Sequence, residues 1–65
     1  MTLKEAEALL RFRQSIEGAV FDDIDAQSWA LCLEGVGYTE ALKAAVEHYR
    51  ESLEPLKPAH ILKRA

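Results

Sequence analysis

Residues 39–53 read TEALKAAVEHYRESL, and this stretch decides the fold. Its large and small apolar side chains recur every three or four residues, at Leu42, Ala45, Val46, Tyr49 and Leu53. This spacing places them on one face of a helix. We therefore expect a helix over residues 40–53, with Thr39 as its N-cap and the Tyr38 ring packed against its first turn.

A shorter helix is expected immediately before this stretch. Apolar side chains follow helical spacing at Ala26, Trp29, Ala30 and Leu33, and Asp25 has the side chain of an N-cap. The pattern predicts a helix over residues 26–33 that buries Trp29. Gly35 and Gly37 then supply the left-handed conformation needed for a tight reversal into the next helix.

The first segment of the chain also has a helical pattern. Thr2 and Glu5 stand at the spacing of a capping box, and Gly18 is a suitable C-cap. These signals predict a helix over residues 3–16 whose buried stripe contains Leu9, Leu10, Phe12 and Ile16. Residues 17–25 are predicted to form a loop, with its apolar side chains tucked under the domain: Val20, Phe21 and Ile24.

Two prolines organise the C-terminal segment. Pro55 disfavours helical backbone in the residue before it, whereas Pro58 suits the first position of a new helix. We expect a closing helix over residues 58–64 that packs Ile61 and Leu62 inward. The whole chain is thus predicted to be one all-α domain over residues 1–65, a small bundle of three to four short helices.

Composition limits the class of protein. The chain has 65 residues, 49% of them hydrophobic and 29% charged, which is typical of one globular domain. The net charge of −3 disfavours a surface that coats nucleic acid, although nucleic acid is kept as a possible ligand. A single cysteine excludes an internal disulfide, and neither a signal peptide nor a membrane span is recognisable, so we expect a cytoplasmic protein. A core this small would gain from self-association or from a partner.

No residue set suggests catalysis, a cofactor or a metal. His48 and His60 are expected on different helices without a second ligand one turn away, with His48 turned toward water and His60 at the edge of a basic surface. Cys32 has no basic neighbour and is predicted to be a packed, inert thiol. The acidic residues Asp22, Asp23 and Asp25 lack the spacing of a calcium loop. We therefore expect a protein that is not an enzyme.

Charge is distributed unevenly along the chain. Residues 17–42 contain six acidic and no basic side chains, whereas residues 43–65 contain five basic and three acidic ones. One charged end could steer a partner of opposite charge, although a solvated surface is the simpler explanation. The predicted partner-binding residues form a basic edge on or near the last helix: Arg50, Lys57, His60, Lys63 and Arg64.

Residues 26–62 resemble a known group of proteins. The pattern comprises Trp29-Ala30 with Leu33, residues 36–42, Ala45-Val46 with His48-Tyr49 and Ser52, and residues 56–61. It is similar to small helical proteins of actinobacteria and their phages, and these resemble the N-terminal domain of phage replicative-helicase loaders. The resemblance implies a helical fold and a role in replication, in which the protein binds the replicative helicase or an initiator without chemistry of its own.

Two functional hypotheses follow from the sequence. The first is a non-enzymatic phage- or prophage-type interaction module that binds a replication protein such as the replicative helicase. The alternative is a small nucleic-acid-binding or regulatory module that uses the basic C-terminal helix; an enzyme is a more distant third.

Overall fold

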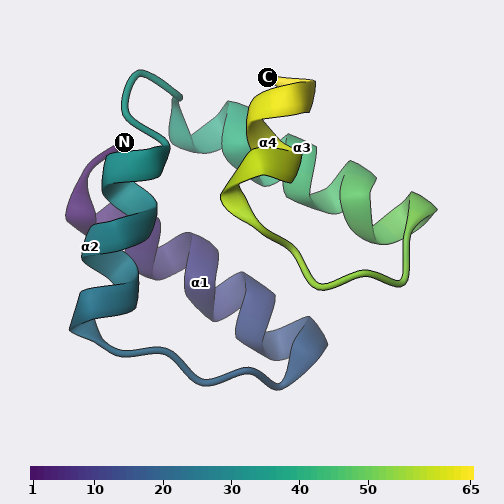
Figure 1. Cartoon of the computed structure of the whole chain (residues 1–65), viewed down its shortest axis with the longest axis horizontal. Helices are drawn as coiled ribbons and strands as arrows, with labels where there is room; N and C mark the ends of the chain where they lie inside the picture. The colour runs from purple at the N-terminus through teal and green to yellow at the C-terminus, as the bar shows by residue number, and fades with distance from the viewer.

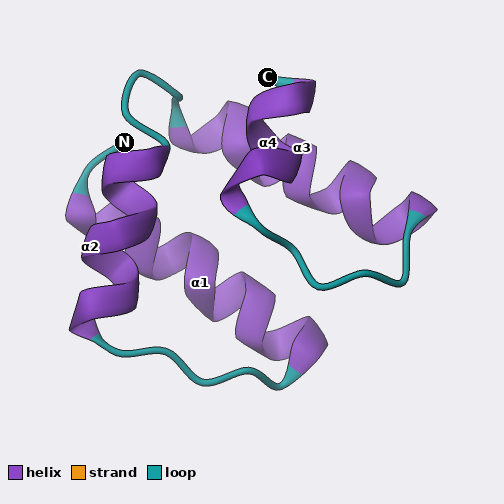
Figure 2. Ribbon diagram, in the orientation of Figure 1, coloured by secondary structure: helices purple, strands orange, loops and turns teal.

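Four helices joined by short connections make up the protein. The computed structural model describes residues 1–65 and contains α1 (Leu3–Glu17), α2 (Asp23–Cys32), α3 (Tyr38–Glu51) and α4 (Pro58–Arg64), with no strand (Figure 2). Helix α2 packs on α1, α4 packs on α3, and α1 joins the two pairs through its contact with α3 (Figure 1). The all-α class is confirmed, and α2 forms one edge of the molecule.

Helix α1 follows its sequence signals closely. The Thr2 hydroxyl accepts a hydrogen bond from the Glu5 amide, and the Glu5 carboxylate accepts one from the Thr2 amide, so the predicted capping box is present. Gly18 ends the helix with a φ of 75°, a left-handed conformation that other residues resist. Ile16 is half exposed, because the end of the helix projects past the core, and its predicted burial is wrong.

Helix α2 begins earlier than predicted. Its N-cap is Asp22, whose carboxylate accepts from the Asp25 amide, while the Asp25 carboxylate accepts from the Asp22 amide. Asp25 is therefore the third residue of the helix and not its N-cap, because this arrangement satisfies two backbone amides at once. The loop is correspondingly short, and Val20 and Ile24 are exposed instead of tucked under the domain; Phe21 is half-buried.

Helix α3 is displaced from its predicted bounds at both ends. Gly37 is its N-cap, so the predicted cap at Thr39 is wrong. Gly37 has ordinary extended backbone, and only Gly35 adopts a left-handed conformation in this turn. The helix ends at Glu51, because Ser52 turns to extended backbone while its amide still donates to the His48 carbonyl. Leu53 consequently lies outside the helix and is fully exposed.

The buried face of α3 is also rotated from the predicted one. It consists mainly of small side chains, Ala41, Ala44, Ala45 and His48. Alanines let the backbones of neighbouring segments come close, so Leu56 and Ile61 pack directly against this face. Of the predicted stripe, Ala45 is buried, whereas Val46 is exposed. Leu42 and Tyr49 flank the core and are only partly buried.

The last helix completes the core. Pro58 occupies the first turn of α4 as predicted, and Ile61 is fully buried. Its neighbour Leu62 is about half exposed, so only one member of the predicted apolar pair points inward. Cys32, predicted to be packed, is exposed at the end of α2, because the inward positions near it are taken by Trp29 and Leu33.

His48 is the one polar residue of the core, with 2% of its surface exposed. Its Nε2 atom lies 2.7 Å from the Glu54 carbonyl oxygen, and its ring stacks on that of His60 with 4.3 Å between centroids. The predicted orientation toward water is wrong, because the chain between α3 and α4 folds back over this side of α3. The buried imidazole thus satisfies a backbone carbonyl of that connection.

Candidate functional site

The predicted basic edge is only partly assembled by the structure. Lys57 and Lys63 are exposed on the α4 side of the molecule, and Arg64 donates to the Glu51 carboxylate at 2.8 Å. This hydrogen bond lowers the pKa of the Glu51 carboxyl. Arg64 therefore ties α4 to α3, and its charge is compensated within the protein.

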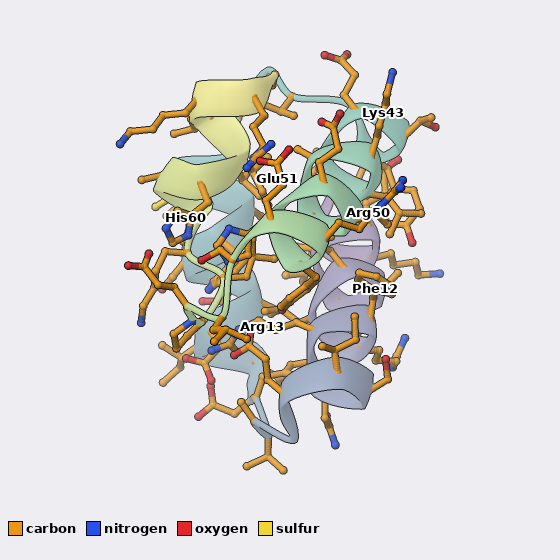
Figure 3. The ribbon with its side chains drawn as sticks, turned by 90° about the vertical axis from the view of Figure 1, so that its right-hand side faces the viewer. Phe12, Arg13, Lys43, Arg50, Glu51 and His60 are labelled. Carbon is orange, nitrogen blue, oxygen red and sulfur yellow. The ribbon has the colours of Figure 1, made fainter.

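Arg50 lies apart from the other predicted residues. Figure 3 shows Arg50 and Lys43 on one side of α3 and His60 on the other. The two cations are seven residues apart, which places them on the same helical face, and α4 covers a different face. The structure thus places Arg50 on the other side of α3 from His60 of the basic edge.

His60 serves in the local structure of α4. Its Nδ1 atom accepts a hydrogen bond from the Lys57 amide at 2.9 Å, which leaves the ring proton on Nε2. That nitrogen lies 3.5 Å from the Glu54 carboxylate. The basic edge therefore contains acidic side chains among its cations, and its field is weaker than the sequence count indicates.

A different surface, the outer side of α2, has the character of a docking site. Ile24 is 70% exposed and Leu31 is 73% exposed, and their separation of seven residues places them on one helical face. The residues between them on this face, Gln27 and Ser28, are uncharged. Large apolar side chains two turns apart therefore face solvent together.

A hollow adjoins this side of α2, where the first turn of α1 approaches it. Its volume is about 540 Å³, and its lining residues are Met1, Leu3, Gln27, Ala30, Leu31 and Glu34. Leu3 of α1 is itself 45% exposed. We define the outer α2 face as Ile24, Gln27, Ser28 and Leu31 together with Leu3.

The sequence contains a signal for this face, but the helical spacing of apolar residues used to predict α2 identified only its buried side. Ala26 and Leu33 are also seven residues apart, and both are buried. Helix α2 thus has one apolar pair directed to the core and a second apolar pair, Ile24 and Leu31, directed to solvent. A search for two apolar stripes on one short helix would have found it.

A partly buried polar cluster joins the end of α1 to α3. The Glu17 carboxylate accepts hydrogen bonds from the Tyr49 hydroxyl and from the Leu56 amide, the latter at 2.9 Å, and Arg13 lies 3.6 Å from its other oxygen. Burial raises the pKa of the Glu17 carboxyl, but the hydrogen bonds from Leu56 and Tyr49 and the charge of Arg13 lower it further than burial raises it. Burial and the bond to Glu17 raise the pKa of Tyr49.

This cluster joins the end of α1 to helix α3 and to the connection that follows it, across 32 and 39 positions of the sequence. The Arg13 guanidinium also lies 5.4 Å from the centre of the Trp29 ring, which extends the cluster to α2. A hollow of about 440 Å³ lies beside Glu17 and Tyr49. The Glu17 carboxylate is committed to its partners in the protein, and its role is structural.

Comparisons of the chain with protein-family models, curated proteins and solved structures gave no match. No three side chains of the His, Cys, Asp and Glu types gather where a metal ion could be held. Each of the four helices is too short or too polar to cross a lipid bilayer.

Proposed function

We propose that this chain is a non-enzymatic protein-interaction module that docks its partner through the outer α2 face. The observation that carries this proposal is the exposure of Ile24 and Leu31 on one side of a helix whose other side is buried. Leaving each such side chain in water forgoes about 1.5–3 kcal/mol relative to full burial. A domain of this size has a net stability of only a few kcal/mol. A partner that covers both side chains would therefore add appreciably to the free energy of unfolding.

The partner that we propose is a protein of the replication machinery, such as the replicative helicase or an initiator, in a phage or prophage setting. Support for this choice comes from the resemblance of residues 26–62 to small helical proteins of actinobacteria and their phages, which in turn resemble the N-terminal domain of helicase loaders. The same proposal places the protein in the cytoplasm, where that machinery works. Acidic side chains among the cations of α3 and α4 make nucleic acid the less favoured ligand.

Binding to purified replicative helicase tests this proposal. The Ile24→Gln/Leu31→Gln double variant removes the apolar contacts without changing the net charge, and Leu53→Gln makes the same kind of change at an exposed leucine outside the face. Loss of a central apolar contact weakens protein binding by about 2 kcal/mol, or roughly thirtyfold. We expect at least this loss for the double variant and less than about a twofold change for Leu53→Gln, as measured by calorimetry.

Two results would contradict the proposal. One is the absence of binding between the wild-type protein and helicase or initiator. The other is unchanged binding by the double variant combined with a loss in Lys57→Glu/Lys63→Glu, which would place the site on the basic edge. Circular dichroism of every variant confirms that the helices are retained.

A further inference from the structure

The charges around the outer α2 face are arranged in a way that selects its ligand. All residues from Ala26 to Leu33 are uncharged, and acidic residues lie at both ends of this segment, with Ile24 among those at its first end. Asp22, Asp23 and Asp25 precede it, and Glu34 follows it. All four carboxylates are exposed, and none forms an ion pair within the protein.

Two of these carboxylates accept no hydrogen bond within the protein. Asp22 and Asp25 each accept a backbone hydrogen bond in the capping box of α2, whereas Asp23 and Glu34 accept no hydrogen bond from the protein. Asp23 is the first residue of α2, and Glu34 lies in the turn just beyond its last residue, Cys32. The two carboxylates therefore flank the two ends of a helix about 15 Å long.

On the neighbouring α1, Glu7 is paired with Arg11 at 3.6 Å. The cations next to Leu3 are Lys4 and the N-terminal ammonium of Met1, which donates to the Leu33 carbonyl at 3.3 Å, so the four carboxylates remain in excess around the face.

We infer that the outer α2 face binds an amphipathic helix of a partner protein, with apolar residues over Ile24 and Leu31 and with Lys or Arg at both ends of the contact. This inference rests on the proposed function and adds the chemistry of the ligand. A helix lying along α2 matches the two-turn spacing of the apolar pair, because an amphipathic helix presents its apolar anchors at the same spacing of seven residues. Cations at its ends would meet Asp23 and Glu34, which would steer association and fix the register.

The charges disfavour other occupants. Phosphate groups of nucleic acid would meet unpaired carboxylates at both ends of the face and be repelled. A second copy of this chain could offer the short helix α4, whose Arg64 is already bound to Glu51, or the side of α3 that carries Lys43 and Arg50. The exposed large apolar side chain on that side of α3 is Val46, which is 39% exposed, so it does not match the pair Ile24 and Leu31. A cationic helix from a different protein therefore fits best.

Two synthetic peptides of about eighteen residues test the inference. Both carry leucines at helical spacings of three, four and seven; one has lysines at its two ends, and the other has glutamates at the same positions. We expect the lysine peptide to bind at least about tenfold more tightly at roughly 50 mM salt, and this preference to fall severalfold at roughly 500 mM salt. Amide chemical shifts should change on α2 and on the first turn of α1.

Variants of the protein separate the contribution of the carboxylates from that of the apolar side chains. Asp23→Asn/Glu34→Gln should weaken binding of the lysine peptide about three- to tenfold and leave the glutamate peptide unaffected or bound more tightly. Glu47→Gln on α3 makes one comparable charge change away from the face and should alter neither affinity by more than about twofold. Ile24→Gln/Leu31→Gln should weaken both peptides.

Equal affinity for the two peptides, or unchanged affinity in Asp23→Asn/Glu34→Gln, would overturn the inference. So would a wild-type dimer in analytical ultracentrifugation that Ile24→Gln/Leu31→Gln dissociates, because a second copy would then be the occupant. Helicase binding that depends on Ile24 and Leu31 but not on Asp23 and Glu34 would preserve the proposed function while refuting the cationic ligand. A lysine peptide that binds as expected without any helicase binding would refute only the replication partner.

Discussion

Helices α2 and α3 use their apolar residues in opposite ways. Helix α3 directs small side chains inward, with Ala41, Ala44 and Ala45 all buried. Helix α2 buries Ala26, and its C-cap Leu33 belongs to the core. The larger Ile24 and Leu31 of the same helix face solvent. Helix α3 thus buries small apolar side chains, whereas α2 exposes two large ones to solvent.

The difference assigns separate roles to the two helices. The small residues of α3 allow α1, α4 and the preceding connection to converge on it, so this helix organises the core. Helix α2 lies at one edge and packs on α1, which leaves its far side free (Figure 1). Polar and apolar residues are less cleanly separated on α2 than on α3. Helix α2 is therefore the better candidate for binding, because its second apolar face has no partner inside the chain.

The largest effect is expected at Leu33, where α2 meets the core. Leu33 is fully buried, and replacing a buried leucine by alanine costs about 2–5 kcal/mol. This is comparable with the whole stability of so small a domain. We therefore expect Leu33→Ala to be largely unfolded at 25 °C in circular dichroism. A cooperative melt close to that of the wild type would show that α2 is not anchored as described.

The next effect concerns the small residues of α3. Ala45 has no exposed surface, so Ala45→Leu would force neighbouring segments apart and cost about 1–3 kcal/mol. Urea unfolding measures this loss. Lys43→Leu places the same side chain at an exposed position of the same helix and serves as the matched control, with an expected change within about 0.5 kcal/mol. Equal stability of the two variants would mean that α3 is not close-packed.

Acidification should loosen the contact between α1 and α3 at Glu17. Because the folded protein lowers the pKa of this carboxyl below its ordinary value of 4.5, its stabilising contribution is present above that value and is lost as the pH falls through the lowered value. The hydrogen bonds involved contribute about 1–3 kcal/mol. Urea unfolding at several pH values should therefore show Glu17→Gln less stable than the wild type at pH 7.

The difference between the two proteins should shrink as the pH falls below 4.5, because protonation gives the wild-type carboxyl the neutral character of the variant. Other carboxyl groups titrate in both proteins alike, so the comparison isolates Glu17. A constant difference across this range would show that the charge of Glu17 does not contribute to the contact.

The smallest effect is expected on the outer side of α2. Leu31→Ala removes the same atoms as Leu33→Ala, only two residues away, but Leu31 is 73% exposed. The free energy of unfolding of the Leu31→Ala variant should differ from that of the wild type by less than about 0.5 kcal/mol, as measured by urea titration. A loss approaching that of Leu33→Ala would mean that Leu31 packs within the domain and is not available to a partner.

Local signals in the sequence determined the four helices and several of their ends. The Thr2 and Glu5 capping box, the left-handed Gly18 and the N-terminal Pro58 act through residues within one helical turn. Such features depend on backbone hydrogen bonds and φ restrictions, so they can be read without knowledge of the fold. The start of α2 was missed because Asp22 and Asp25 can each serve as a cap, and the reciprocal pair satisfies more amides than Asp25 alone.

Tertiary structure alone decided which faces are buried and which residues meet. Glu17 contacts Tyr49 and Leu56 across 32 and 39 positions of the sequence, and no local pattern encodes such contacts. The return of the chain over α3 buried His48, and Arg50 lies on the other side of α3 from His60. Likewise, Ile24 and Leu31 face solvent because α1 covers only one side of α2. Periodicity shows that a helix has an apolar side, but burial depends on where the rest of the chain comes to lie.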